Sequence, residues 1–140
     1  MEFDALQRCL KRYPEIVAAY LFGSAVSGKM TPMSDIDVAL IVRDETTLDE
    51  ILLLTSNIAS DIQRLFHREG DVKVLNRIQR LPFLHEVLAT GKLIVEREPE
   101  IHRRFIRRIL TAYLDFQPVY EKCLRTYAGS LQRGQTQSRA

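Results

Sequence analysis

The chain lacks several sequence features that are typical of particular protein classes. It contains no tryptophan and only two cysteines, Cys9 and Cys123, which lie far apart and outside any Cys-x-x-Cys or metal-ligand spacing. This argues against a disulfide framework, and both thiols are expected to be reduced, partly buried small apolar residues. No linker of biased composition and no internal repeat divides the 140 residues, so one domain with one core is expected.

No charge of one sign dominates. Twenty Lys and Arg residues against 18 Asp and Glu residues give a formal net charge of +2, which argues for neither direct nucleic-acid binding nor a membrane partner. No hydrophobic run reaches the length of a membrane span, and residues 1–14 lack the apolar core of a signal peptide. We therefore expect a cytoplasmic protein; 46% hydrophobic and 27% charged residues are a usual globular balance.

Helical and strand patterns alternate along the chain. Strands are predicted at residues 16–22, 35–42, 71–75 and 92–96. Helices are predicted after an N-cap at Asp4, after the capping box of Thr47 and Glu50, between Pro82 and a C-cap at Gly91, and after Pro99, where Pro118 must kink or split the helix. This order predicts an α/β unit with a C-terminal helical extension.

Residues 20–42, YLFGSAVSGKMTPMSDIDVALIV, place two carboxylates at the start of an otherwise apolar strand. Side chains at i and i+2 of a strand point to the same face, so Asp35 and Asp37 are expected to project together. Two such carboxylates repel each other unless a cation lies between them, and oxygen ligands suit Mg²⁺. Asp71, at the start of a later strand, could supply a third ligand and help to hold a second ion, as in phosphoryl or nucleotidyl transfer.

Gly23 and Ser24 end the first of these strands and suit an anion site. A glycine lets the backbone approach a phosphate closely, and a serine hydroxyl with exposed backbone N–H groups can hold phosphate oxygens. A Gly-Ser pair or an Asp-x-Asp motif alone is usually a turn or a solvated strand end. Their combination, ten residues apart and followed by a strand-borne aspartate, favours a nucleotide-handling enzyme.

The pattern Gly23-Ser24, ten residues, Asp35-Ile36-Asp37 resembles the signature of the polymerase-beta-like nucleotidyltransferases. The small size is similar to their minimal nucleotidyltransferase (MNT) branch, and within it to antitoxins encoded beside HEPN-domain ribonuclease toxins. The resemblance covers roughly residues 15–98. It implies a small mixed sheet flanked by helices, with a nucleotidyltransferase domain at 1–98. The helical pattern after Pro99 predicts a helical extension at 99–128 in the same compact unit, and the polar composition of residues 129–140 predicts a flexible tail.

The resemblance also implies a function. Such antitoxins use ATP to attach AMP to a tyrosine of the HEPN toxin, which silences it, so a hetero-oligomer with that toxin is expected. Gly23 and Ser24 would hold the triphosphate, and Asp35 and Asp37 would bind two Mg²⁺ ions. Asp71 would complete one metal site and favour deprotonation of the tyrosine hydroxyl.

The chain departs from the family pattern in one place. Many relatives carry an arginine within the first few residues after Gly-Ser, whereas here the nearest cation is Lys29. Either triphosphate affinity is weaker, or Lys29 or a distant arginine such as Arg77 substitutes.

Two other functions stay open at this level. AMP transfer to a small hydroxylated compound such as an aminoglycoside would normally need a further substrate-binding domain. A non-catalytic antitoxin would neutralise its toxin by contact alone, although the intact Gly-Ser pair and the three aspartates argue against lost activity.

The last helix carries a stripe of arginines beside its apolar face. These residues could meet an acidic partner or a nucleic acid, although a solvated helix face is the simpler interpretation. The stripe comprises Arg103, Arg104, Arg107 and Arg108. The apolar face is longer than a small sheet needs for cover and could also dock the toxin.

Overall fold

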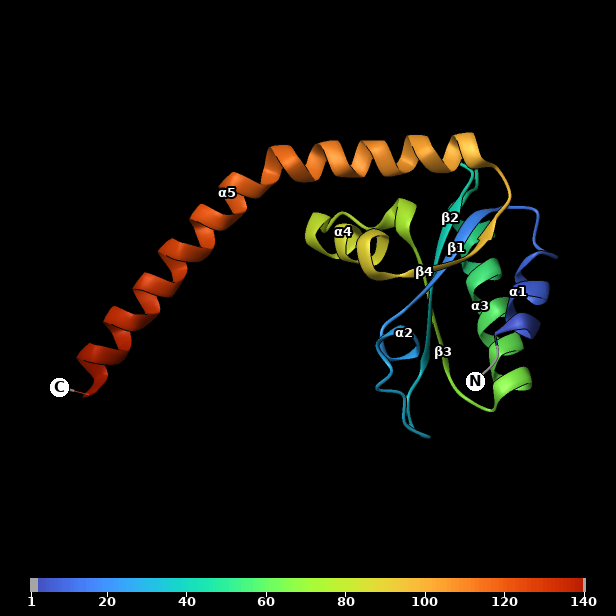
Figure 1. Cartoon of the computed structure of the whole chain (residues 1–140), viewed down its shortest axis with the longest axis horizontal. Helices are drawn as coiled ribbons and strands as arrows, with labels where there is room; N and C mark the ends of the chain where they lie inside the picture. Colours follow the sequence, from blue (N-terminus) through green and yellow to red (C-terminus); the bar gives the residue numbers. More distant parts are fainter. Residues whose placement is uncertain (1–2, 140) are drawn as a thin grey trace.

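The computed structural model describes residues 3–139, without the side chains of residues 116, 117, 119, 120, 127, 128 and 130–139. Its elements are, in order, α1 (Asp4–Leu10), β1 (Ile16–Phe22), α2 (Ser24–Ser27), β2 (Ile36–Val42), α3 (Leu48–Phe66), β3 (Gly70–Val74), the 3₁₀ turn η1 (Leu75–Arg77), α4 (Leu81–Thr90), β4 (Lys92–Glu96) and α5 (Pro99–Arg139). Figure 1 shows a sheet with helices on both sides, from which α5 extends far outward.

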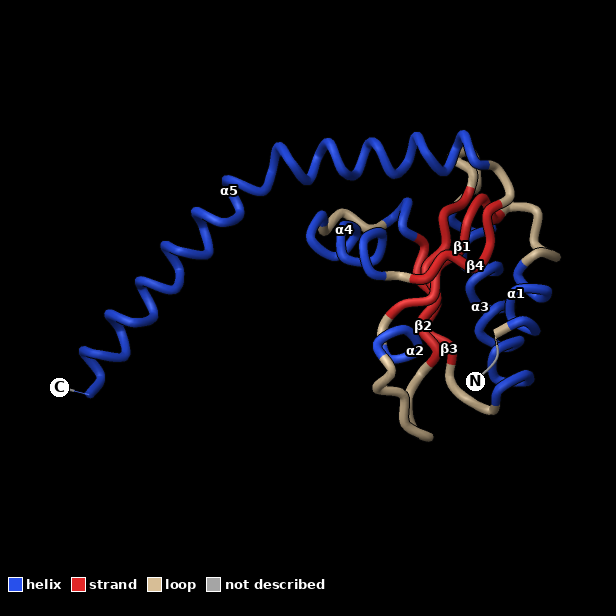
Figure 2. Tube along the Cα trace, in the orientation of Figure 1, coloured by secondary structure: helices blue, strands red, loops and turns tan. Residues whose placement is uncertain are grey.

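The four strands form one mixed sheet in the order β3-β2-β1-β4 (Figure 2). β1 runs antiparallel to both β2 and β4, whereas β2 and β3 are parallel. β1 and β2 are buried along nearly their whole length because helices cover both faces of the sheet, which is why their sequences read as continuous apolar runs. The expected fold, a small mixed sheet flanked by helices with a C-terminal helical extension, is confirmed.

Two apolar clusters lie on opposite faces of the sheet. One contains Leu6 of α1 and Ile58 of α3; the other contains Leu84 of α4 and Phe105 of α5. Figure 1 shows α1 and α3 on one side of the sheet and α4 on the other, with α5 running along the top and over α4. The start of α5 is therefore part of the folded body and not a separate appendage.

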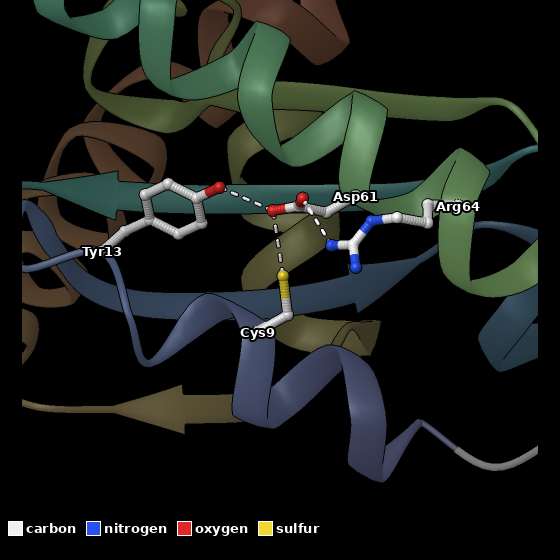
Figure 3. Close-up of polar contacts among 4 residues, drawn as sticks. All are labelled: Cys9, Tyr13, Asp61 and Arg64. Carbon is white, nitrogen blue, oxygen red and sulfur yellow. Dashed lines mark hydrogen bonds and ion pairs between the residues drawn. The ribbon is translucent and has the colours of Figure 1, made fainter.

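A polar network joins α1 to α3 on the first of these faces (Figure 3). Oδ2 of Asp61 accepts hydrogen bonds from the Tyr13 hydroxyl at 2.6 Å and the Cys9 thiol at 3.1 Å, and Oδ1 pairs with Arg64 at 2.9 Å. Burial, then the hydrogen bond to Asp61, raises the pKa of the Cys9 thiol to about 11. A buried thiol with a raised pKa is a poor nucleophile, and Cys9 is one of the apolar core residues.

A second network fixes the first turn of α5 against the sheet. The buried ring of His102 lies with Nε2 2.5 Å from the Tyr20 hydroxyl and Nδ1 3.1 Å from Oε2 of Glu96. Arg97, just before the helix, donates to the backbone carbonyls of Tyr13, at 2.7 Å, and of Lys11. These contacts set the direction in which α5 leaves the body.

Two local expectations are wrong. Asp4 is the first helical residue of α1 and not its cap, because Phe3 occupies that position without a side-chain cap bond. Cys123 is exposed instead of partly buried. Gly91 caps α4 as expected, in an extended conformation with φ −68° and ψ 155°, although glycine caps more often adopt the left-handed one.

Pro118 kinks α5 without splitting it. The helix is continuous from Pro99 to Arg139, and Figure 1 shows a change of direction in the part of α5 that contains Pro118. Tyr120 and Tyr127 of the expected apolar face lie outside the described side chains. The domain bounds and the flexible tail stay predictions. None of the described helices combines the length and apolarity that crossing a membrane requires.

Candidate functional site

The last residue of β1 lies at the same end of the sheet as the first residues of β2 and β3. The antiparallel ladder pairs Phe22, the last residue of β1, with Asp37 near the start of β2. The parallel ladder pairs Asp37 with Asp71 near the start of β3. The topology thus brings the turn after β1 and two of the predicted carboxylates to the same end of the sheet.

Gly23 turns the chain directly against the Asp37 carboxylate. Its φ of 69° and ψ of −142° fall in a region that essentially only glycine adopts. A methyl group on Gly23 would lie 3.3 Å from Cγ of Asp37 and closer still to Oδ2. The turn continues into α2 through hydrogen bonds from Val26 N and Ser27 N to the Gly23 carbonyl, both 3.1 Å. The missing side chain therefore permits the close approach, and Ser24 follows it at the start of α2.

The carboxylates at this end of the sheet repel one another. Burial, followed by the charges of Asp71 and Asp35, raises the pKa of Asp37, and the positive charge of Lys73 partly opposes the rise. Nζ of Lys73 lies 3.7 Å from Oδ2 of Asp71. A donor set of carboxylate oxygens that repel one another fits a hard cation such as Mg²⁺, which would relieve the repulsion.

Asp35 lies outside this close pair. It precedes β2 by one residue and is exposed, although its charge acts on Asp37. The loop before it is held by Arg68, whose Nη1 donates to the carbonyls of Thr31 at 2.5 Å and Ser34 at 3.0 Å. Among the described residues, no three His, Cys, Asp or Glu side chains gather closely enough to hold a metal ion. The structure therefore brings Asp37 and Asp71 together and leaves Asp35 at the rim.

The two candidate cations differ in position. Lys29 is exposed and follows Gly28, the left-handed C-cap of the short helix α2 that begins after Gly23. Arg77 lies in η1 beyond the far end of β3, where Asn76 bonds the backbone of Val42 at the opposite end of the sheet. Arg77 is therefore too far along the chain from Asp71 to replace the missing arginine, and Lys29 stays the candidate.

Sequence reasoning missed two residues of this site. Lys73 stands two positions after Asp71 on β3, so the period of a strand could have placed both side chains on one face. Arg68 holds the loop before Asp35 through two backbone carbonyls, for which the sequence carries no signal.

Comparison with known families identifies the fold. The family model described as Polymerase beta, nucleotidyltransferase matches residues 4–100. The chain belongs to this nucleotidyltransferase family. No curated protein matches its sequence.

Solved structures with the same fold are similar over most of this chain. A chain of a toxin–antitoxin crystal structure with AMP-PNP has a TM-score of 0.65 and 20% identity, covering 89% of this chain and 99% of its own. A chain of the MntA-HepT toxin–antitoxin structure has a TM-score of 0.54 and 19% identity, covering 85% and 92%. A tri-AMPylated Shewanella oneidensis HEPN toxin in complex with MNT antitoxin gives a TM-score of 0.55 and 18% identity, covering 84% and 95%. At these identities the likeness shows the fold of this nucleotidyltransferase.

Proposed function

We propose that this nucleotidyltransferase is an MNT antitoxin that transfers AMP from ATP to a tyrosine of a partner HEPN toxin. The observation that carries the proposal is the Gly23 turn, which packs on Asp37 beside Asp71 at one end of the strands of the family's sheet. Solved structures with this fold include a toxin–antitoxin complex with AMP-PNP and an AMP-modified HEPN toxin with its MNT antitoxin. Both support ATP as the substrate and the toxin as the acceptor.

At this end of the sheet, one set of residues binds the triphosphate and another would bind the metal ions. Gly23 and Ser24 hold the triphosphate through the backbone N–H groups of the turn and the Ser24 hydroxyl, while the absent Gly23 side chain leaves room for the Asp37 carboxylate beside them. Asp35, Asp37 and Asp71 are the residues that would hold Mg²⁺, with Asp35 turning inward from the rim. Bound Mg²⁺ would neutralise charge on the triphosphate and on the leaving pyrophosphate.

The transfer makes one bond and breaks one. The tyrosine oxygen forms a bond to the α-phosphorus of ATP, the bond from that phosphorus to the β-phosphate oxygen breaks, and pyrophosphate leaves with the electron pair. The Asp71 carboxylate favours loss of the hydroxyl proton. The protein contributes mainly by positioning the reactants and stabilising charge, and Lys73 offsets part of the negative charge that Asp71 adds.

One observation favours a second candidate, a non-catalytic antitoxin that inhibits by contact. Asp35 is exposed, and the described carboxylates do not form a group of three ready for a metal. A vestigial metal site would have this arrangement. Substrate binding that draws Asp35 inward would give the same arrangement in the free protein.

A growth assay separates the two candidates. The proposed HEPN toxin partner is expressed with the native chain, with Asp35→Ala/Asp37→Ala, or with the control Asp4→Ala/Asp49→Ala, which removes two exposed aspartates elsewhere. The proposal predicts growth with the native chain and the control, and toxicity with the site variant present at equal level. Full protection by the site variant would establish contact inhibition.

A further inference from the structure

The first part of α5 carries an exposed group of arginines, Arg103, Arg104, Arg107 and Arg108, which we term the arginine face. Within the described part of the chain, none of them forms an ion pair with a carboxylate. Glu100, three and four residues before Arg103 and Arg104, is positioned for such pairs but makes none. Among the described side chains, Arg108 alone of the four has an internal partner, the Phe105 ring, whose centroid lies 5.2 Å from the guanidinium carbon.

This composition is unlike that of a merely solvated helix face. Arginines four residues apart repel each other, and a solvated face usually places acidic residues or lysines at such positions. Interfaces between proteins are enriched in arginine and depleted in lysine, because the planar guanidinium binds carboxylates through two hydrogen bonds. The arginine face therefore has the composition of a surface built to receive carboxylates.

Two hollows flank the arginine face. One, of about 370 Å³, is lined by Arg104, Arg108 and Phe105 of α5, by the end of β2 with Arg43, and by Asn76. The other, of about 220 Å³, is lined by Glu100, Arg103, Arg104 and Arg107. Both hollows are open to solvent, so their guanidinium groups are accessible to the side chains of a partner.

The charges around the larger hollow decide the class of partner. Asp44 and Glu45 line it, and Glu100 lines the smaller one. A nucleic acid would bring a phosphate against each of these carboxylates, whereas a folded protein can place acidic residues on the arginines and basic or neutral ones beside the carboxylates. The mixed charge favours a protein partner.

An apolar strip continues the arginine face along α5. The spacing i, i+4, i+7, i+11 places Arg103, Arg107, Leu110 and Leu114 on one side of the helix. Leu110 is 39% and Leu114 67% exposed. Beyond this strip α5 stands clear of the body (Figures 1 and 2). The strip adds the apolar contact that a charged surface alone would lack.

We propose that the arginine face and the strip of Leu110 and Leu114 form the docking surface for the HEPN toxin, whose matching surface is acidic with an apolar centre. The partner's identity rests on the proposed function. Val42, which lines the larger hollow, lies at the opposite end of β2 from Asp37, about 17 Å along the strand at about 3.4 Å per residue. Docking and chemistry therefore use separate residues of the chain.

The test is the affinity for the proposed HEPN toxin partner, measured by titration calorimetry without ATP. Arg103→Glu/Arg107→Glu is compared with the matched control Lys11→Glu/Arg12→Glu, which makes the same charge change at two exposed residues just after α1. The proposal predicts at least a tenfold rise in Kd for the arginine variant and less than a twofold change for the control. Equal affinities of the two variants would overturn it, provided that circular dichroism shows both folded.

A second readout keeps this inference apart from the proposed function. In an AMP-transfer assay, the arginine variant should need at least tenfold more toxin for half-maximal rate and should recover the native rate at saturation. If neither the native chain nor the variant transfers AMP, the proposed function fails, but the calorimetric comparison still tests whether the arginine face binds the toxin. Loss of binding to a labelled single-stranded RNA with unchanged toxin affinity would overturn the proposal in favour of a nucleic-acid surface.

Discussion

Replacing Gly23 with alanine tests the geometry of the site most sharply. Gly23 holds φ 69° and ψ −142°, where a side chain costs about 1–3 kcal/mol of backbone strain. The new methyl group would also lie 3.3 Å from Cγ of Asp37 and closer to Oδ2, so the carboxylate must move. A displacement of about 1 Å in a catalytic group can lower a rate about 100-fold. Gly23→Ala should therefore lose both stability and AMP transfer.

Gly28→Ala is the matched control. Gly28 also has a positive φ, 77°, but nothing lies within 4 Å of the position of an added methyl group. A left-handed alanine costs about 1–2 kcal/mol, so this variant should lose stability to a similar degree. Because it does not touch Asp37, its rate of AMP transfer should stay within about threefold of the native rate, far less than the effect of a displaced catalytic group.

The assay pairs thermal unfolding with the rate of AMP transfer at saturating ATP and toxin. Both variants should lose several degrees of Tm, at about 4 °C per kcal/mol for a domain of this size. Only Gly23→Ala should lose about 100-fold in rate. Equal rates for the two variants would refute the claim that the Gly23 turn positions Asp37.

Two further predictions concern titrating carboxylates. Because burial and then the charges of Asp71 and Asp35 raise the pKa of Asp37, the ionised carboxylate destabilises the fold as pH rises through that pKa. Asp37→Asn should therefore raise Tm at pH 7 while abolishing transfer; a lower Tm in calorimetry would contradict this. Burial alone would raise the pKa of Asp61, but hydrogen bonds, first the one from Tyr13, lower it. The ionised Asp61 carboxylate therefore stabilises the fold above about pH 4, and this stabilisation is lost as the pH falls through the folded-state pKa. Asp61→Asn should lower the free energy of unfolding, measured in urea at pH 7, by about 1–3 kcal/mol, and should make stability depend less on pH in the acid range. An unchanged dependence of stability on acid pH would argue against the network.

The main elements of the fold could be predicted because the signals for them are local. The apolar run 16–22 matches β1, and the capping box of Thr47 and Glu50 starts α3, with the Glu50 amide 3.2 Å from the Thr47 hydroxyl oxygen. The order of strands in the sheet depends on contacts between distant segments, which the sequence pattern alone does not reveal.

The site could be predicted in part. That Asp37 and Asp71 belong to one site follows from their positions at the starts of two strands, and the register now pairs them directly. The exposure of Asp35 could not be predicted, because β2 begins only where Ile36 N bonds the Glu69 carbonyl at 2.9 Å, a contact between distant segments. The sequence did predict the cap at Gly91, where close packing requires glycine because an added methyl group would collide with the Val87 carbonyl.

The central claim, AMP transfer to a HEPN protein, is tested most directly by intact mass. The proposed partner, a HEPN toxin, is incubated with ATP, Mg²⁺ and either the native chain or Asp35→Ala/Asp37→Ala, and its intact mass is measured by mass spectrometry. The account predicts that the toxin gains one or more AMP units with the native chain alone, on a tyrosine that peptide mapping identifies. An unchanged toxin mass with tight binding retained would contradict it and leave inhibition by contact.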